Sequence, residues 1–188
     1  ITNAMALRRE LIERGSIFQS SSDSECIIHL MARSIQRNIP ERMKDALRRI
    51  EGAFSVIAMT RTKLIGVRDP LGVRPLVIGK LADGGFVLSS ETCGLDIIGA
   101  EFLREVEPGE MVVISKGKIE SSRPFQQTAS RFCIFEHVYF SRPDSIIGGR
   151  SVYETRRQIG VADLGDLVAG VLEGAVRLRG RAVLEIAT

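Results

Sequence analysis

The feature that most constrains the fold is a change of hydrophobic period near Gly52. Before it, apolar residues recur at helical spacing in three segments, about 2–14, 22–37 and 40–51. After it, the pattern becomes that of strands, and short turns separate five of them, 54–60, 64–67, 75–78, 86–89 and 110–114. Three helices followed by a run of antiparallel strands predict an α+β protein in which sheets stack and helices pack outside them.

Shorter elements are expected on either side of these strands. They are a strand over 17–19, a short helix over 94–98, a strand over 134–140, a helix over 151–159 and a further helix over 164–176. The loop 145–150 precedes the helix over 151–159, and the character of the chain changes after about residue 160. The sequence therefore predicts one main domain, a linker and a tail.

Composition excludes several classes of protein. Of the 188 residues, 44% are hydrophobic and 26% charged, which is typical of a globular chain and not of a disordered one. The net charge is +3, and basic residues are interspersed with acids, so no nucleic-acid-binding surface is expected. No apolar run approaches ~18 residues and no signal peptide is present, so no membrane partner is expected. Because the chain opens on Ile1 without a methionine, we expect upstream sequence to be missing.

The three cysteines, Cys26, Cys93 and Cys133, are odd in number and far apart. No Cys-x-x-Cys or Cys/His ligand spacing occurs, so neither a disulfide framework nor a zinc site is predicted. This cysteine usage indicates a reducing, cytoplasmic setting.

A helix-start motif lies at Ser22-Asp23-Ser24-Glu25, where the Ser-x-x-Glu spacing predicts a capping box. The helix that follows is expected to bury one stripe, formed by Ile27, Leu30, Met31 and Ile35. On the sequence alone, Asp23 does no more than help to start this helix, since capping is the usual role of such residues.

The segment Val67–Leu76 joins two strands through a turn with two prolines, one glycine, two arginines and an aspartate. Such a composition is too specific for a generic hairpin. Because a buried arginine needs a carboxylate partner, Arg68, Asp69 and Arg74 are expected to form an ion-pair network, with Asp69 or Glu91 as the acid.

These motifs resemble those of the amidophosphoribosyltransferases, which open purine synthesis. The matching segments occur in the family's order, namely Ser22–Glu25, Glu51–Ser55, Arg68–Leu76, Ser89–Glu91, Val106–Glu110 and Phe135–Ser145. The resemblance covers about residues 1–160. It implies an incomplete αββα sandwich of the N-terminal-nucleophile hydrolase type. Glucosamine-6-phosphate synthase and asparagine synthetase share that fold, but Phe140–Ser145 argues against both.

The resemblance also implies a division of the chain. Residues 1–145 would be a glutaminase domain that lacks its N-terminal strands. Residues 146–160 would lead toward a phosphoribosyltransferase domain, and 161–188 would be a divergent tail produced by a frameshift, an assembly join or real divergence. Without the N-terminal strands, exposed strand edges would favour self-association of the chain.

In the family, a terminal cysteine attacks the glutamine side-chain amide, with its own α-amino group as base. The released ammonia displaces pyrophosphate from phosphoribosyl pyrophosphate in the second domain, where magnesium accompanies that substrate. The family's nucleophile, its Asn-Gly oxyanion hole and the arginine that holds the glutamine carboxylate lie upstream of Ile1. The resemblance therefore assigns no catalytic residue to this chain, and we expect the chain alone to be inactive.

Asp23 is the one glutamine-binding residue that the resemblance carries over, as the carboxylate for the substrate's α-ammonium group; Ser22 would support it. Arg68, Asp69, Arg74 and Glu91 would either fix the hairpin beside the site or contact the second domain. Cys133 matches the first iron–sulfur ligand of cluster-bearing members, but the remaining ligands lie farther downstream in the family, so a buried free cysteine is expected here and not a cluster. A homo-oligomer is expected. An alternative function is a non-catalytic glutamine-binding or subunit-interaction module.

Overall fold

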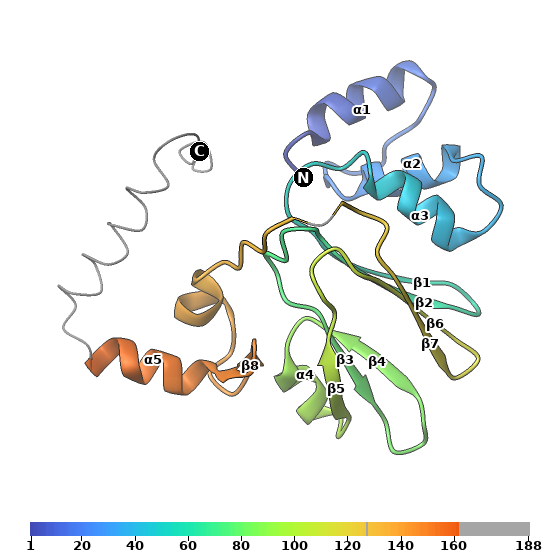
Figure 1. The fold of residues 1–188 in the computed structure, drawn as a ribbon. Helices are drawn as coiled ribbons and strands as arrows, with labels where there is room; N and C mark the ends of the chain where they lie inside the picture. The colour runs from blue at the N-terminus through green and yellow to red at the C-terminus, as the bar shows by residue number, and fades with distance from the viewer. Residues whose placement is uncertain (127, 162–188) are drawn as a thin grey trace.

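The computed structural model describes residues 1–126 and 128–161. Three helices open the chain: α1 (Ala4–Glu13), α2 (Glu25–Arg33) and α3 (Ile39–Leu47). They gather on one side of the molecule (Figure 1). Each turns an apolar stripe inward, and the largest fully buried side chains there are Leu11, Met43 and Leu47.

The first sheet is antiparallel, with the strand order β1-β2-β6-β7. Its strands are β1 (Ser55–Met59), β2 (Leu64–Arg68), β6 (Met111–Ser115) and β7 (Lys118–Ser122). β2 and β6 are central and pair through Val67 opposite Met111 and Ile65 opposite Val113. The four side chains of these pairs pack in the core with α1–α3, and Val112, on the opposite face, belongs to a second apolar core. Burial of both faces explains why the two strands are almost continuously apolar.

The second sheet is also antiparallel, with the order β4-β3-β5. It consists of β3 (Val77–Lys80), β4 (Phe86–Ser89) and β5 (Glu101–Glu105), and the helix α4 (Thr92–Ile97) lies beside β3 and β5 (Figure 1). Val77 packs with Leu95 of α4 on the outer face. The register between β3 and β5 shifts between Ile78 and Gly79.

The two sheets stack face to face through a small apolar core. Ile78 of the second sheet packs with Val112 of the first. A Cβ at Gly66 would lie 2.7 Å from Leu88 Cδ1, so any larger residue would displace Leu88, and glycine favours the close approach of the sheets. The layers therefore run helices, sheet, sheet, helix, which confirms the predicted α+β sandwich.

A separate segment follows the sheets. It contains a one-turn π-helix, η1 (Glu136–Phe140), the strand pair β8 (Ile146–Ile147) and β9 (Arg150–Ser151), and the helix α5 (Val152–Val161). The strand predicted over 134–140 is wrong, because its backbone bonds locally: His137 N–H donates to Ile134 O and Ser141 N–H to Glu136 O. α5 confirms the helix predicted over 151–159, whereas the helix predicted over 164–176 and the divergent tail lie outside the described residues.

Other differences have local causes. α2 ends at Arg33, so Ile35 lies beyond the helix and is 94% exposed instead of completing the buried stripe. The segment 17–19 forms no strand. β5 was not predicted, because its sequence, Glu-Phe-Leu-Arg-Glu, lacks β-branched residues. Within 1–126 and 128–161, no helix is long and apolar enough to cross a membrane.

Candidate functional site

A pocket of 380 Å³ lies where the start of α2, β1 and the turn before β3 meet. Asp23 and Arg74 are its two charged side chains. Polar and apolar groups complete the lining, namely Ile1, Ser24, Ile27, Ala53, Phe54, Ser55, Val56, Ile57, Pro75, Leu76 and Ser90. A pocket with a carboxylate and a guanidinium among its walls suits a small polar ligand.

Asp23 lies just before α2, and its side chain is 51% exposed. The α-ammonium group of Ile1 donates to its Oδ2 at 2.7 Å. This hydrogen bond is the main reason why the pKa of Asp23 lies below its usual range. With about half of its side chain exposed, the Asp23 carboxylate can accept a hydrogen bond from a donor that enters the pocket.

Glu25, and not a capping box, fixes the loop that carries Asp23. The N-cap residue of α2 is Ser24, without a side-chain cap bond, so the predicted box is wrong. Glu25 instead turns back, and its carboxylate accepts from the Ser20 hydroxyl at 2.6 Å and the Gln19 N–H at 2.8 Å. These bonds lower the pKa of Glu25 to about 2. Ser22 shares a hydrogen bond with Ser24 at 2.7 Å and so supports the same loop.

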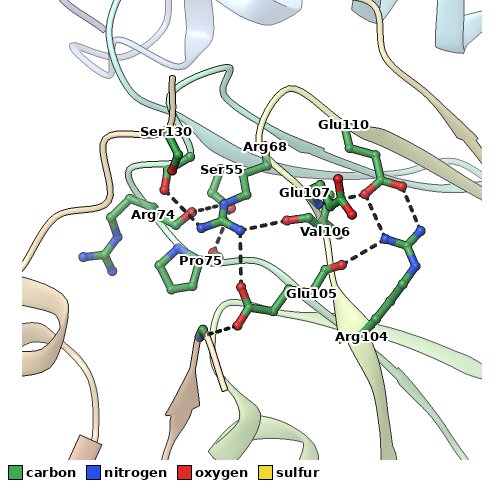
Figure 2. Close-up of polar contacts among 12 residues, drawn as sticks. Ser55, Arg68, Arg74, Pro75, Arg104, Glu105, Val106, Glu107, Glu110 and Ser130 are labelled. Carbon is green, nitrogen blue, oxygen red and sulfur yellow. Dashed lines mark hydrogen bonds and ion pairs between the residues drawn. The ribbon is translucent and has the colours of Figure 1, made fainter. Parts of the chain in front are cut away.

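Arg68 is buried at the end of β2 and satisfies three backbone carbonyls (Figure 2). Its Nε donates to Arg74 O at 2.8 Å, Nη1 to Val106 O at 2.8 Å, and Nη2 to Gly72 O at 3.0 Å. Its acid partner is Glu105, at 3.4 Å. The prediction that Asp69 or Glu91 would pair with Arg68 is wrong, because the unpredicted strand β5 supplies Glu105.

Asp69 is fully buried, yet it has backbone partners instead of an arginine. Its carboxylate accepts from Leu71 N–H at 2.9 Å and Val73 N–H at 3.3 Å. Burial raises the pKa of Asp69, although these backbone bonds act in the opposite direction. Asp69 therefore shapes the turn.

Arg74 points away from the Arg68 contacts (Figure 2). Its Nη1 lies 2.6 Å from Oε1 of the buried Glu136, and its guanidinium lies over the Phe140 ring at 5.3 Å. The predicted network of Arg68, Asp69 and Arg74 is thus three separate arrangements. The acid partner of Arg74, Glu136, was not predicted from the sequence, because the segment 134–140 was expected to form a strand and not η1.

Glu91 and Glu105 together hold the segment that leads into α5. Glu91 Oε2 accepts from Arg142 N–H and the Ser145 hydroxyl, both at 2.8 Å. Glu105 Oε1 accepts from Gly148 N–H at 2.6 Å. Glu91 therefore fastens the later segment to the sheets, and it does not line the pocket.

A second charged contact joins β5 to the start of β6. Arg104 donates to both carboxylate oxygens of Glu110 at 2.8 Å (Figure 2). Burial alone would raise the pKa of Glu110, but the bonds from Arg104 and Glu107 N–H prevail and lower it to about 2. This pair stabilises the connection between the two sheets, next to Glu105.

The described residues do not fit an iron–sulfur cluster. Cys133 is free and half-buried. No group of three or more His, Cys, Asp or Glu side chains in the described part of the chain could hold a metal ion. The described residues also offer no cluster of such side chains for magnesium.

The comparison with protein families defines the class of this chain. A family model, the glutamine amidotransferase domain, matches residues 1–96, slightly more than half of the sequence. The chain therefore belongs to the glutamine amidotransferase domain family.

Within that family, the chain is similar to amidophosphoribosyltransferases. It is 50% identical over 165 residues to the Rhizobium etli enzyme and 47% identical over 160 residues to the chloroplastic enzyme 1 of Arabidopsis thaliana. These alignments cover 85% of this chain but 33% and 28% of the relatives. The chain thus spans about a third of the length of these relatives.

A solved structure gives the same result for the fold. The B. subtilis glutamine phosphoribosylpyrophosphate amidotransferase, complexed with ADP and GMP, superposes with a TM-score of 0.81 at 43% identity. The superposition covers 84% of this chain and 34% of that one. This similarity confirms the sandwich architecture predicted from the sequence.

Proposed function

We propose that this chain is the part of an amidophosphoribosyltransferase that forms one side of its glutamine site. The whole enzyme would convert phosphoribosyl pyrophosphate, glutamine and water to 5-phosphoribosylamine, glutamate and pyrophosphate. The observation that carries the proposal is the pocket in which the half-exposed Asp23 carboxylate and the Arg74 guanidinium are the two charged side chains. The similarity to relatives of that name supports it.

Asp23 would bind the α-ammonium group of glutamine. An aspartate carboxyl is ionised at neutral pH, so Asp23 offers a full negative charge. The loop that carries it is held by Glu25, whose bonds to Gln19 and Ser20 leave the Asp23 carboxylate facing the pocket. Positioning of the substrate, and not bond cleavage, is therefore the role of these residues.

The nucleophile would come from outside the described pocket. Cys26 is buried in the helical core, Cys93 is buried beside Glu91, and Cys133 lies in the segment after the sheets. None of the three lines the pocket. A polypeptide of this sequence alone should therefore release no glutamate from glutamine.

Several parts of the proposal concern the whole enzyme. Phosphoribosyl pyrophosphate and its magnesium ion would bind in a second domain, and the enzyme would be a homo-oligomer. A reducing compartment such as the cytoplasm agrees with three free cysteines.

A chimeric enzyme tests this function. Residues 1–160 of this chain would replace the matching segment of the Rhizobium etli relative, and formation of phosphoribosylamine would be measured with glutamine or with ammonium salts as nitrogen donor. We expect glutamine-dependent activity, and we expect Asp23→Asn to raise the KM for glutamine about tenfold or more without changing the ammonia-dependent rate.

The matched control is Asp83→Asn, in an exposed turn remote from the pocket, where asparagine can still accept from Gly85 N–H. It should leave both rates unchanged. A chimera that uses ammonia but not glutamine would contradict the proposal, as would an Asp23→Asn variant with unaltered KM.

A second candidate is a glutamine-binding module without catalysis. The accessible Asp23 carboxylate, in a pocket that no cysteine lines, favours this alternative. Calorimetry on the 188-residue chain with an acetylated amino terminus would distinguish it. Saturable glutamine binding that is lost in Asp23→Asn, combined with an inactive chimera, would support the module over the enzyme.

A further inference from the structure

A buried carboxylate lies behind one wall of the pocket. Glu136, the first residue of η1, has a side chain that is 1% exposed. Its Oε2 accepts from the Ser141 hydroxyl at 2.9 Å. Its Oε1 lies 2.6 Å from Arg74 Nη1, at an angle that leaves this oxygen without a hydrogen bond. Charge attraction is therefore the main link between Glu136 and Arg74.

The backbone of Arg74 is held independently of its side chain. Its carbonyl accepts from Arg68 Nε at 2.8 Å, and the next carbonyl, of Pro75, accepts from the Ser55 hydroxyl at 3.2 Å (Figure 2). What Glu136 controls is thus the direction of the guanidinium, which also lies over the Phe140 ring.

The direction matters because Arg74 shares its pocket with Asp23. A flexible guanidinium in such a pocket is attracted to any free carboxylate, and a carboxylate paired with arginine is unavailable to a ligand's ammonium group. The buried Glu136 attracts the guanidinium more strongly, because an unpaired carboxylate is far more costly in the interior than at an exposed position. Arg74, at 43% exposure, stays with it.

We propose that Glu136 is a positioning residue of the pocket: it engages the Arg74 guanidinium and so leaves the Asp23 carboxylate free for the ammonium group of an amino acid. The identity of that amino acid as glutamine rests on the proposed function, whereas the competition between the two carboxylates does not. Glu136, in η1, thus keeps the Asp23 carboxylate unpaired although it lies more than a hundred residues downstream of Asp23 in the sequence.

The first test uses the 188-residue chain with an acetylated amino terminus, so that the Ile1 ammonium group cannot occupy Asp23. Carbon-13 NMR would follow the titration of the Asp23 carboxyl. In Glu136→Gln, the released guanidinium should lower the pKa of Asp23 by about half a unit or more. In the double variant Glu136→Gln with Arg74→Gln, the pKa should return to its original value. An Asp23 pKa that is the same in all three proteins would overturn the proposal.

The second test uses the chimeric enzyme. Glu136→Gln should raise the KM for glutamine about fivefold and leave ammonia-dependent activity within about twofold, and the double variant should restore the KM. A raised KM that persists in the double variant would overturn the proposal. A parent chimera without glutamine-dependent activity would instead contradict the proposed function, and the NMR titration would still decide the role of Glu136.

Thermal melts would accompany every measurement to check that each variant folds. If Glu136→Gln does not fold, Glu136→Asp replaces it, because aspartate keeps the charge but its shorter side chain lies farther from Arg74. The pKa of Asp23 should then fall by a smaller amount. Glu154→Gln in α5 is the matched control, because it breaks an exposed ion pair with Arg157 in the same segment. It should alter neither the Asp23 pKa nor the KM.

Discussion

The turn 68–76 and the loop before α2 contribute to the same pocket, but they use their charges differently. In the turn, Arg68 and Asp69 are buried, and backbone groups occupy nearly all of their hydrogen-bonding capacity. In the loop, the Asp23 side chain is half exposed and lines the pocket. The comparison teaches that a distinctive motif, such as the turn 68–76, can be needed for the fold and not for ligand binding. The charged side chain that remains exposed to solvent, Asp23, is the one available to a ligand.

The largest effect should come from Arg68→Met. The change removes three hydrogen bonds to buried carbonyls and leaves Glu105 without its cation, which should cost about 3–5 kcal/mol in the free energy of unfolding. Urea denaturation measures this. Arg61→Met, in the exposed turn between β1 and β2, is the control and should change little. A loss below about 1 kcal/mol would break the comparison, since the turn would then not depend on its arginine.

A second substitution isolates the geometry of the turn. Gly72 has φ +63°, and a Cβ there would lie 2.6 Å from Pro108 Cγ. Gly84 has φ +89° with open space around it. Both alanine variants pay for the left-handed backbone, about 1–2 kcal/mol, but Gly72→Ala should be less stable than Gly84→Ala by a further 1–3 kcal/mol, roughly. If the two alanine variants lose equal amounts of stability in thermal melts, Pro108 must shift to accommodate the new Cβ at no measurable cost.

The third prediction concerns pH. The folded pKa of Glu110, about 2, lies below its ordinary value of 4.5, so its stabilising contribution is complete above about pH 4.5 and is lost as the pH falls toward 2. Glu110→Gln should cost about 2 kcal/mol at pH 7 and flatten the acid dependence of unfolding in that window. Glu120→Gln, on the exposed side of β7, serves as the control. A variant with an unchanged acid profile would contradict the assignment.

The smallest effect on stability should come from Asp23→Asn. An exposed side chain outside any buried network should change the free energy of unfolding by less than about 0.5 kcal/mol. The same variant should nevertheless impair the use of glutamine in the chimera. Thermal melts and glutamine kinetics on one preparation would sharpen the comparison. A large loss of stability would place Asp23 with the architectural residues instead.

The sequence allows the layers to be predicted, because hydrophobic period reports which face of each element is buried. It does not allow the partners to be predicted. Arg68 was expected to pair with a carboxylate near in sequence, but β5 brings Glu105 from 37 positions away. The apolar run around Glu136 matches a strand as well as a turn of helix. Only its local hydrogen bonds, formed in three dimensions, distinguish the two.

The bonds from Glu91 and Glu105 to residues 142–148 have a mechanical consequence. Both carboxylates belong to the second sheet or its edge, and together with Thr92, which accepts from Ile146 N–H, they anchor the backbone just ahead of α5. The base of that helix is thereby clamped at several points rather than hinged at one. We therefore expect a rotation of α5 to move together with the second sheet, and not independently of it.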